Sequence, residues 1–433
     1  MNKYYYLTII LFYYLVIHLN ICAQTSTNST YSMYGIGDLE TNDYGKLGSM
    51  GNTGIALKSQ HYLNQINPAS LSGLDSLSFI YDFSAMGSIT HATQNGAYYE
   101  NIFTGNFKRL AIGCRLFPWW ATSVGVSPYS MVGYQIDQTN PVNGINQDYI
   151  IDYQGSGGLN QFYWANSFKL TKNLSVGFNS AFIFGTVDQN EVIIGSAFDQ
   201  VNSYTTTNYK GFYFNYGLQY AFNINEHFEG IIGGVFGNKQ YLNYTENLLI
   251  QDLTMRDTVI NETLGTGSFA IPLFYGVGLS LCRNKEFTWA VDYKHQRWNI
   301  VSISSGAGSM INSTSNLGSP FSNTASLENT NTLSFGFEYA PNKRIPKNYL
   351  DLMKYRFGLS YNETYLQIYD TPIKDYCMTM GFGMPASRSA SLNVGFEVGR
   401  RGTIDNNLIQ EFYYMMKVNI TFDDAWFIRS RYQ

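Results

Sequence analysis

The chain has 433 residues, of which 16% are aromatic and only 13% are charged, and its formal net charge at pH 7 is −4. An ordinary soluble domain carries about 25% charged residues, so this composition argues against an ordinary water-exposed surface. It also lacks the basic excess of a nucleic-acid-binding protein. Beyond the N-terminus no stretch reaches about 18 uncharged apolar residues, which argues against a protein that crosses a membrane with several helices.

The N-terminus has the pattern of a secretory signal peptide. Lys3 precedes the apolar run LTIILFYYLVIHL, and the small residue Ala23 precedes Gln24. A basic start, an apolar core and a small residue at the cleavage site predict removal of residues 1–23. In an alternative, Cys22 carries a lipid, but Asn20 and Ile21 are poor residues before a lipidated cysteine.

The remaining cysteines predict no covalent framework. Cys114, Cys282 and Cys377 are odd in number and widely spaced. Neither a set of disulfides nor a metal motif follows from this spacing.

Residues 24–76 show no regular alternation of apolar and polar residues. They contain YSMYGIGDL at 31–39, GSMGNTGIAL at 48–57 and INPASL at 66–71. Their glycines allow backbone segments to approach one another closely. We therefore expect a compact plug that packs inside a barrel, where polar lumen residues satisfy its amide groups.

From residue 77 onward, apolar residues recur at every second position, which is the period of a β-strand. In EFYYMMKVNITF, for example, Phe412, Tyr414 and Met416 share one face, whereas Lys417 and Asn419 lie on the other. The polar faces carry mostly Gly, Ser and Asn and only scattered charges. Such strands fit a transmembrane β-barrel, in which apolar side chains face lipid and small or polar ones face the lumen.

The fold that these patterns predict is an all-β outer-membrane barrel of about fourteen antiparallel strands over residues 77–433, with residues 24–76 as an N-terminal plug or hatch. Short predicted turns, such as 171–172 and 284–285, alternate with long predicted loops at 86–104, 138–158, 191–206, 249–267 and 301–330. Because outer-membrane barrels have short periplasmic turns and long external loops, we expect both termini to be periplasmic.

One predicted strand, SVGVSPYSMVGY at 123–134, contains a proline. Pro128 cannot donate a hydrogen bond to a sheet, and proline is normally confined to edge strands and bulges. With Gly125 and Gly133 nearby, it predicts an irregularity in this strand.

These features together resemble the FadL-type outer-membrane transporters of hydrophobic compounds. The resemblance rests on a glycine-rich N-terminal segment that ends in Asn67-Pro68-Ala69 and on a third strand broken at Pro128. YSMYGIGDL, SPYSMVGY and the closing run DYCMTMGFGMPASRSASLNVGFEVGRRGT are similar to the branch of this superfamily found in Bacteroidota. The resemblance implies that Asn67, Pro68 and Ala69 form a hatch motif and that the kink opens a lateral gap. The alternative for Asn-Pro is an ordinary turn.

Charged residues at lumen-facing positions are expected to pair across strands and with the plug, because an unpaired charge in a confined lumen is costly. The alternative is a role in selecting a solute. These residues are Arg109, Arg115, Asp292, Lys294, Glu338, Arg356, Glu397, Glu411 and Lys417.

No catalytic or metal-binding pattern is present in the sequence. GxSxG, HExxH and CxxC do not occur. Asp292 and His295 are three residues apart on a predicted strand, which directs them to opposite faces. We expect a protein that is not an enzyme and that has no metal and no cofactor.

Two functions are compatible with this sequence. The first is passive uptake of hydrophobic, fatty-acid-like molecules through the hatch and the lateral gap, which requires an apolar pocket between plug and wall near Pro128. The second is a non-conducting barrel that serves as a subunit or docking partner of a larger outer-membrane machine, such as type 9 secretion or barrel assembly. The expected partners are outer-membrane lipid, a hydrophobic ligand or other outer-membrane proteins, and not nucleic acid.

Overall fold

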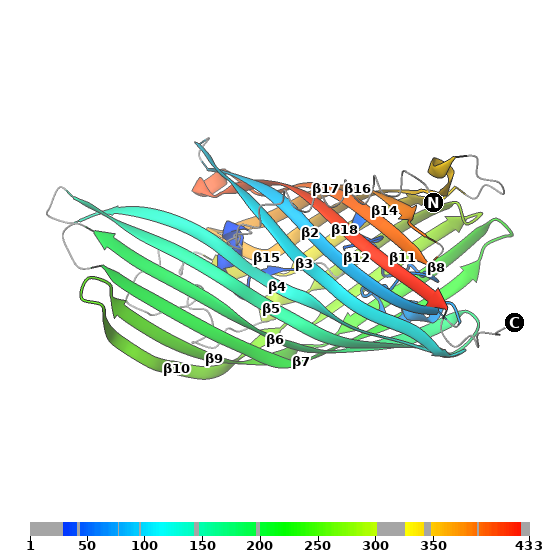
Figure 1. Ribbon diagram of the computed structural model, residues 1–433, viewed down its shortest axis with the longest axis horizontal. Helices are drawn as coiled ribbons and strands as arrows, with labels where there is room; N and C mark the ends of the chain where they lie inside the picture. Colours follow the sequence, from blue (N-terminus) through cyan, green and yellow to red (C-terminus); the bar gives the residue numbers. More distant parts are fainter. Residues whose placement is uncertain are drawn as a thin grey trace, which may run out of the picture.

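The computed structural model describes residues 29–425, apart from 41–43, 77, 95–96, 143–146, 196–199, 301–324, 342–347 and 388. The predicted signal peptide, residues 1–23, and most of the predicted loop 301–330 lie outside the described residues. The described strands form one antiparallel sheet that closes into a barrel (Figure 1). Among the described residues, no helix has the length and apolar character needed to span a membrane.

The barrel wall follows the chain order. Its first part consists of β2 (Ser78–Gln94), β3 (Ala97–Phe117), β4 (Trp120–Pro141), β5 (Asp148–Lys169), β6 (Leu174–Gly195) and β7 (Val201–Asn223). Its second part consists of β8 (Phe228–Gly237), β9 (Gln240–Asp252), β10 (Asp257–Ile271), β11 (Phe274–Arg283), β12 (Phe287–Gln296), β13 (Ala325–Leu327), β14 (Thr330–Tyr339), β15 (Lys354–Ile368), β16 (Thr371–Pro385), β17 (Ala390–Gly402) and β18 (Gln410–Ala425). Because β18 pairs with β2, the wall is closed. β8 with β9, β10 with β11, and β13 with β14 each occupy one position, so the predicted barrel of 14 strands is confirmed.

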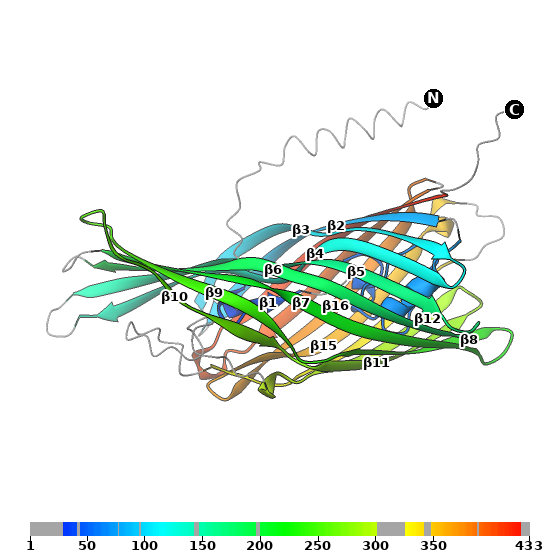
Figure 2. The same cartoon turned by 90° about the horizontal axis from the view of Figure 1, so that it is seen from below.

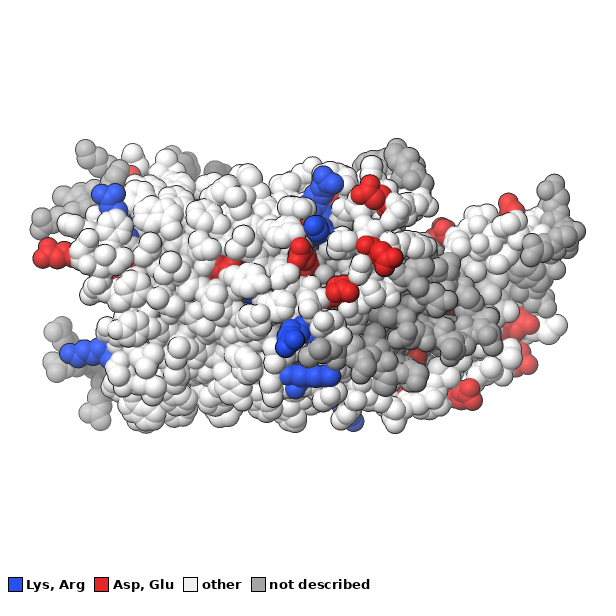
Figure 3. All heavy atoms as spheres, turned by 180° about the vertical axis from the view of Figure 1, so that it is seen from behind, with Lys and Arg blue, Asp and Glu red and all other residues white. Residues whose placement is uncertain are grey.

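The alternation that predicted the strands corresponds to two faces of the wall. On β18, Phe412, Tyr414 and Met416 are 40%, 47% and 46% exposed, whereas Glu411 and Lys417 are buried. Exposed apolar side chains recur in this way around the barrel, and Figure 3 shows a broad part of its outer surface with very few charged residues. This part has the character of a lipid-facing belt.

The N-terminal segment lies inside the barrel (Figure 2). It forms the short helices η1 (Thr30–Met33), η2 (Gly48–Met50) and η3 (Pro68–Gly73) and the two-residue strand β1 (Asp38–Leu39). η1 contacts β4, η2 contacts β14 to β17, and η3 contacts β4 to β7. The segment therefore bridges opposite sides of the wall. Three further short helices, η4 (Trp298–Ile300), η5 (Tyr349–Leu352) and η6 (Asp405–Asn407), lie in connections between strands.

The predicted loops at 86–104, 138–158, 191–206 and 249–267 are wrong, because strands continue through most of each range. On β6, for example, the exposed Phe182 and Phe184 are followed on the same face by Asp188 and Asn190. Outside the apolar belt the outward positions become polar, so the hydrophobic alternation ends although backbone pairing continues. Because these strands are longer than their neighbours, β4 to β7, β9 and β10 project beyond the rest of the barrel. The projection lies at the end opposite to the start of β2 and the end of β18 (Figures 1 and 2).

We call this projection the wall extension. It comprises residues 134–141, 148–156, 186–195, 201–208 and 244–266.

Candidate functional site: the hatch and the seam beside strand β4

The predicted hatch motif fixes the N-terminal segment to the wall through Asn67. Its side-chain oxygen accepts a hydrogen bond from the Ala69 amide (3.0 Å) and so caps η3, which begins at Pro68. Its Nδ2 donates to the carbonyl oxygens of Ile55 (2.7 Å) and Leu218 (3.2 Å). One buried amide therefore joins two parts of the hatch to the inner face of β7.

Two glycines of the wall provide the space for this contact. A Cβ atom on Gly217 of β7 would overlap the Asn67 side chain. A Cβ atom on Gly177 of β6 would lie only 2.5 Å from the amide nitrogen of Ala69, which is also an overlap. Because glycine has no side chain, the hatch backbone can lie directly against the strands.

Several of the lumen charges named from the sequence are held in short polar contacts. Glu338 accepts from Lys46 of the hatch (2.8 Å) and from Arg356 of β15 (2.6 Å). Asp292 accepts from the backbone amides of Gly54 (2.6 Å) and Ile55 (2.9 Å). Both carboxylates thus tie the hatch to the wall.

The other named charges form similar contacts. Lys417 pairs with Glu397 (2.6 Å), Arg109 with Asp82 (2.8 Å), and Arg115 donates to the Ser72 carbonyl (3.2 Å). Lys294 lies over the ring of Phe274, 5.0 Å from its centre.

The pairing of β3 with β4 ends midway along both strands. It runs from Phe117 opposite Trp120 to Leu110 opposite Val126. β4 then has an irregularity between Pro128 and Ser130 in its register with β5. Beyond Leu110 and Val126, β3 and β4 are no longer paired. We call this separation of the two strands the seam, and Pro128 lies at its start.

The N-terminal segment occupies the β4 side of the seam. In β1, Asp38 lies opposite Met131 and Leu39 opposite Ser130. The Glu40 amide donates to the Tyr129 carbonyl (3.0 Å), and the Ser29 amide donates to the Gly133 carbonyl (3.2 Å). Strand β1 thus adds to the edge that β3 leaves free, which is the pairing mode of an added strand at a sheet edge.

The β3 side of the seam is joined to the same segment by a buried ion pair. Lys108 is fully buried, and its Nζ donates to Glu40 Oε1 at 2.6 Å. The ammonium group also lies 5.2 Å from the centre of the Tyr44 ring, in the geometry of a cation–π contact. Glu40 therefore contacts β4 through its backbone and β3 through its side chain.

The wall bends beside the seam at two consecutive glycines of β5. Gly157 and Gly158 have φ angles of 103° and 138°, which L-residues with a side chain rarely adopt. A Cβ on Gly157 would overlap the Thr186 carbonyl, and a Cβ on Gly158 would overlap the Ser130 carbonyl. These two glycines allow the bend, which lies beside the register irregularity between Pro128 and Ser130. Gly125 has a different role: it leaves space for the Tyr163 ring.

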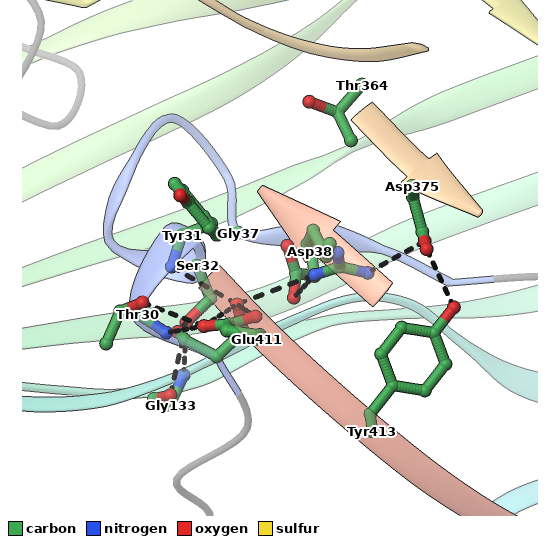
Figure 4. A network of polar contacts seen from close by, with 12 residues as sticks. Thr30, Tyr31, Ser32, Gly37, Asp38, Gly133, Thr364, Asp375, Glu411 and Tyr413 are labelled. Atoms are coloured by element: carbon green, nitrogen blue, oxygen red, sulfur yellow. Dashed lines mark hydrogen bonds and ion pairs between the residues drawn. The ribbon is translucent and has the colours of Figure 1, made fainter. Parts of the chain in front are cut away.

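A second set of contacts anchors the start of the segment to β16, β17 and β18 (Figure 4). Glu411 accepts from the Thr30 amide (2.9 Å), the Thr30 hydroxyl (2.7 Å) and the Ser29 hydroxyl (2.8 Å). Arg401 bridges Asp38 (2.7 Å) and Asp375 (3.6 Å). We call these contacts the anchor network.

Tyr31 belongs to the same anchor. Burial raises the pKa of its phenol above the usual range, and the negative charge of Glu411 adds to this effect. The phenol therefore stays protonated and donates to the Ile409 carbonyl. This hydrogen bond fixes η1 to the chain just before β18.

The sequence did not predict Lys108 as a lumen-facing charge, because the alternation of apolar and polar residues fails beside the seam. Lys108 and Arg109 are adjacent, yet both are fully buried, since the pairing of β2 with β3 is irregular between Ser84 and Ala85. A strict two-residue period would place one of them in lipid. The run YSMYGIGDL is assigned to the plug, but nothing in its residues predicts that the last two form β1.

The structure brings together no catalytic or metal-binding group among its described residues. Asp292 is engaged with the hatch amides, and His295 contacts Asn331 at 2.8 Å. No cluster of three or more His, Cys, Asp or Glu side chains suited to a metal ion occurs in the described part of the chain.

A family model described as BamG matches residues 5–433. The chain belongs to the BamG family. A comparison with curated proteins found no match.

Solved structures similar to this BamG-family chain are outer-membrane channels and transporters. The toluene transporter TodX of Pseudomonas putida matches with a TM-score of 0.56 and 14% identity, over 91% of this chain and 100% of that chain. A Pseudomonas aeruginosa FadL homologue matches with a TM-score of 0.54 and 12% identity, over 90% and 99%. The toluene transporter TbuX of Ralstonia pickettii matches with a TM-score of 0.52 and 14% identity, over 88% and 99%.

At these identities the similarity shows the fold alone. It confirms that the barrel has the FadL-type fold, as the resemblance implied. None of these proteins is described as an enzyme, in agreement with the expectation that this chain is not one.

Proposed function

We propose that this protein is an outer-membrane barrel that keeps its lateral gap closed with its own N-terminal segment and serves as a docking subunit of a larger outer-membrane machine. The observation that carries the proposal is the pairing of β1 with the free edge of β4. In a lateral route, a hydrophobic solute would leave the lumen at this edge. Here the edge is already hydrogen-bonded from Tyr129 to Gly133.

The contacts between hatch and wall support a barrel that does not conduct. Three ion pairs link the hatch to the wall: Lys46 with Glu338, the buried Lys108 with Glu40, and Asp38 with Arg401. Breaking one buried pair costs about 3–5 kcal/mol. An opening that displaced the hatch would break several of them without supplying new partners.

Of the two machines expected from the sequence, barrel assembly is the one we propose, since the family name BamG agrees with it. We also propose periplasmic termini, so that the wall extension lies on the outer side of the membrane. In this orientation the protein offers a polar, projecting surface to other components outside the lipid.

Passive uptake of a hydrophobic, fatty-acid-like molecule is the second candidate. It is favoured by the FadL-type fold and by the position of Pro128 at the start of the seam. In that case β1 would have to leave the edge of β4 during each transport event.

Purification from native membranes in mild detergent tests the proposal. We expect a stable, stoichiometric complex with other outer-membrane proteins when the extract is measured by native mass spectrometry. A monomer that carries a bound hydrophobic molecule would contradict docking and support uptake.

A further inference from the structure

The wall extension carries an excess of negative charge. Its charged residues are nine carboxylates, Asp137, Asp148, Asp152, Asp188, Glu191, Glu246, Asp252, Asp257 and Glu262, and one guanidinium, Arg256 in the turn between β9 and β10. Acidic side chains are visible on the projecting end in Figure 3. The extension thus differs from the barrel below it, where lumen charges such as Glu338, Arg109 and Lys417 pair with opposite charges.

Four of these carboxylates share the outer face of β4 to β6. Tyr134 and Tyr153 are buried toward the lumen. Asp137 lies three residues after Tyr134, and Asp152 lies one residue before Tyr153. Because an odd separation along a strand reverses the face, both carboxylates are on the outer side. Asp148 and Asp188 lie on this side as well. We call these four residues, together with Ile150 and Ile194, the acidic face.

Two carboxylates of the acidic face lie directly opposite one another. Asp137 and Asp152 are paired positions on β4 and β5. Like charges at paired positions destabilise a sheet. Asp152 Oδ2 accepts from Gln154 (2.6 Å), but its Oδ1 is buried and has no hydrogen-bond partner in the described structure. Among the described residues, no donor lies within hydrogen-bond distance of this oxygen.

Apolar side chains lie beside these charges although the face is outside the lipid belt. Ile150 and Ile194 are paired on β5 and β6 and are 41% and 40% exposed. An apolar centre with charged surroundings is typical of a protein interface. A lipid surface is disfavoured, because anionic head groups would be repelled by four carboxylates.

We propose that the acidic face is the surface on which a partner protein docks, through a patch of Lys and Arg side chains around an apolar centre. This inference rests on the proposed docking function and names the chemistry of the partner. The partner's cations would neutralise the Asp137–Asp152 pair and donate to the free oxygen of Asp152. Its apolar side chains would cover Ile150 and Ile194.

The test replaces both paired carboxylates by the isosteric amide, as Asp137→Asn with Asp152→Asn. A matched control, Glu226→Gln with Glu229→Gln, removes two exposed carboxylates at the opposite end of the barrel. The fraction of the protein in the complex is measured on native gels, from native membranes in mild detergent, at rising NaCl and with or without EDTA.

We expect the amide variant to lower the association constant about tenfold or more, and the control to behave as the unmodified chain. Rising NaCl should dissociate the complex and EDTA should not, because protein cations and not divalent metal ions neutralise the face. A complex that is unaffected by the amide variant, or one that EDTA alone dissociates, would overturn this inference and leave docking intact. A chain without any stoichiometric partner would overturn the proposed function itself.

Discussion

Glu411 is the residue that holds the start of the N-terminal segment to the wall. It accepts three hydrogen bonds from Ser29 and Thr30 and is 2% exposed. Hydrogen bonds to a charged group contribute about 1.5–3 kcal/mol each, more than those between neutral groups. The position of β1 in the seam therefore depends on this carboxylate, which lies far away in the sequence.

The variant Glu411→Gln should loosen residues 29–39 without unfolding the barrel. The amide keeps the shape but loses the charge, and we expect a loss of about 1–2 kcal/mol in local stability. Hydrogen exchange of residues 29–39 in the detergent-solubilised protein should then be about tenfold faster or more. Glu226→Gln, in an exposed turn, is the control. Equal exchange in the two variants would show that Glu411 does not hold the segment.

Asn67 has a comparable role at the other end of the hatch. Asn67→Ala removes the cap of η3 and leaves the buried carbonyl of Ile55 with one donor fewer. The expected cost is about 1–3 kcal/mol from the lost cap and the lost hydrogen bonds, since the Ile55 carbonyl still accepts from Gln219 (2.8 Å). Limited proteolysis should detect faster cleavage within residues 55–74, whereas Asn225→Ala in an exposed turn should leave cleavage unchanged. An unchanged rate for Asn67→Ala would mean that Asn67-Pro68-Ala69 is an ordinary turn.

The sequence predicted which charged residues face the lumen only where the two-residue period of a strand is maintained. Asp292, Arg356 and Lys417 fall on the lumen-facing positions of regular strands and are found there. Glu40 lies in the irregular hatch and Lys108 next to a register shift, and for such positions no period relates sequence to direction. Their pairing depends on contacts between segments far apart in the chain.

At the scale of the element, β1 and the bend of β5 form the seam together. β1 has two residues and could not persist as a strand alone. It is formed because β4 presents a free edge, and that edge is free because β4 turns away from β3 at the irregularity beside Pro128. Gly157 and Gly158 allow β5 to follow this turn.

The variant Gly158→Ala tests the bend. The positive φ angle and the overlap with the Ser130 carbonyl should together cost about 2–3 kcal/mol or more. We expect a lower midpoint of urea unfolding of the barrel in detergent. Gly265→Ala is the matched control, because a Cβ there has open space within 4 Å. Similar midpoints for both variants would show that the bend does not depend on glycine at 158.

The lengths of the strands were the main error of prediction at this scale. The hydrophobic period identifies the part of a strand that crosses lipid, where one side must be apolar. In the wall extension both sides carry polar residues, as at Asp188 on the outer face and the buried Gln189 on the inner face of β6. Backbone hydrogen bonds hold these parts in the sheet, and a hydrophobic pattern does not report them.

At the scale of the whole molecule, strand number and fold class follow from a short set of physical rules. Alternating faces, few charges and a glycine-rich start predicted a 14-strand barrel with a hatch, and the strand count agrees. The closed seam could not be predicted, since it results from the meeting of residues 38–40 with residues 129–131. In this barrel, the edge of β4 is occupied through a few local contacts that the FadL-type fold does not by itself specify.

The most direct test of the closed seam is a reversible disulfide between β1 and β4, made as Leu39→Cys with Ser130→Cys. The chain used for it has Cys114, Cys282 and Cys377 replaced by serine. The two positions are paired, and Val394→Cys with Val418→Cys, paired on β17 and β18, is the control. Protein-dependent uptake of a labelled fatty acid into proteoliposomes is measured before oxidation, after oxidation and after reduction. A barrel that stays closed and works by docking predicts no protein-dependent uptake in any of these states and an unchanged yield of the native complex after oxidation. Uptake that stops when the Leu39–Ser130 pair is oxidised, returns on reduction and is unaffected in the control would contradict it.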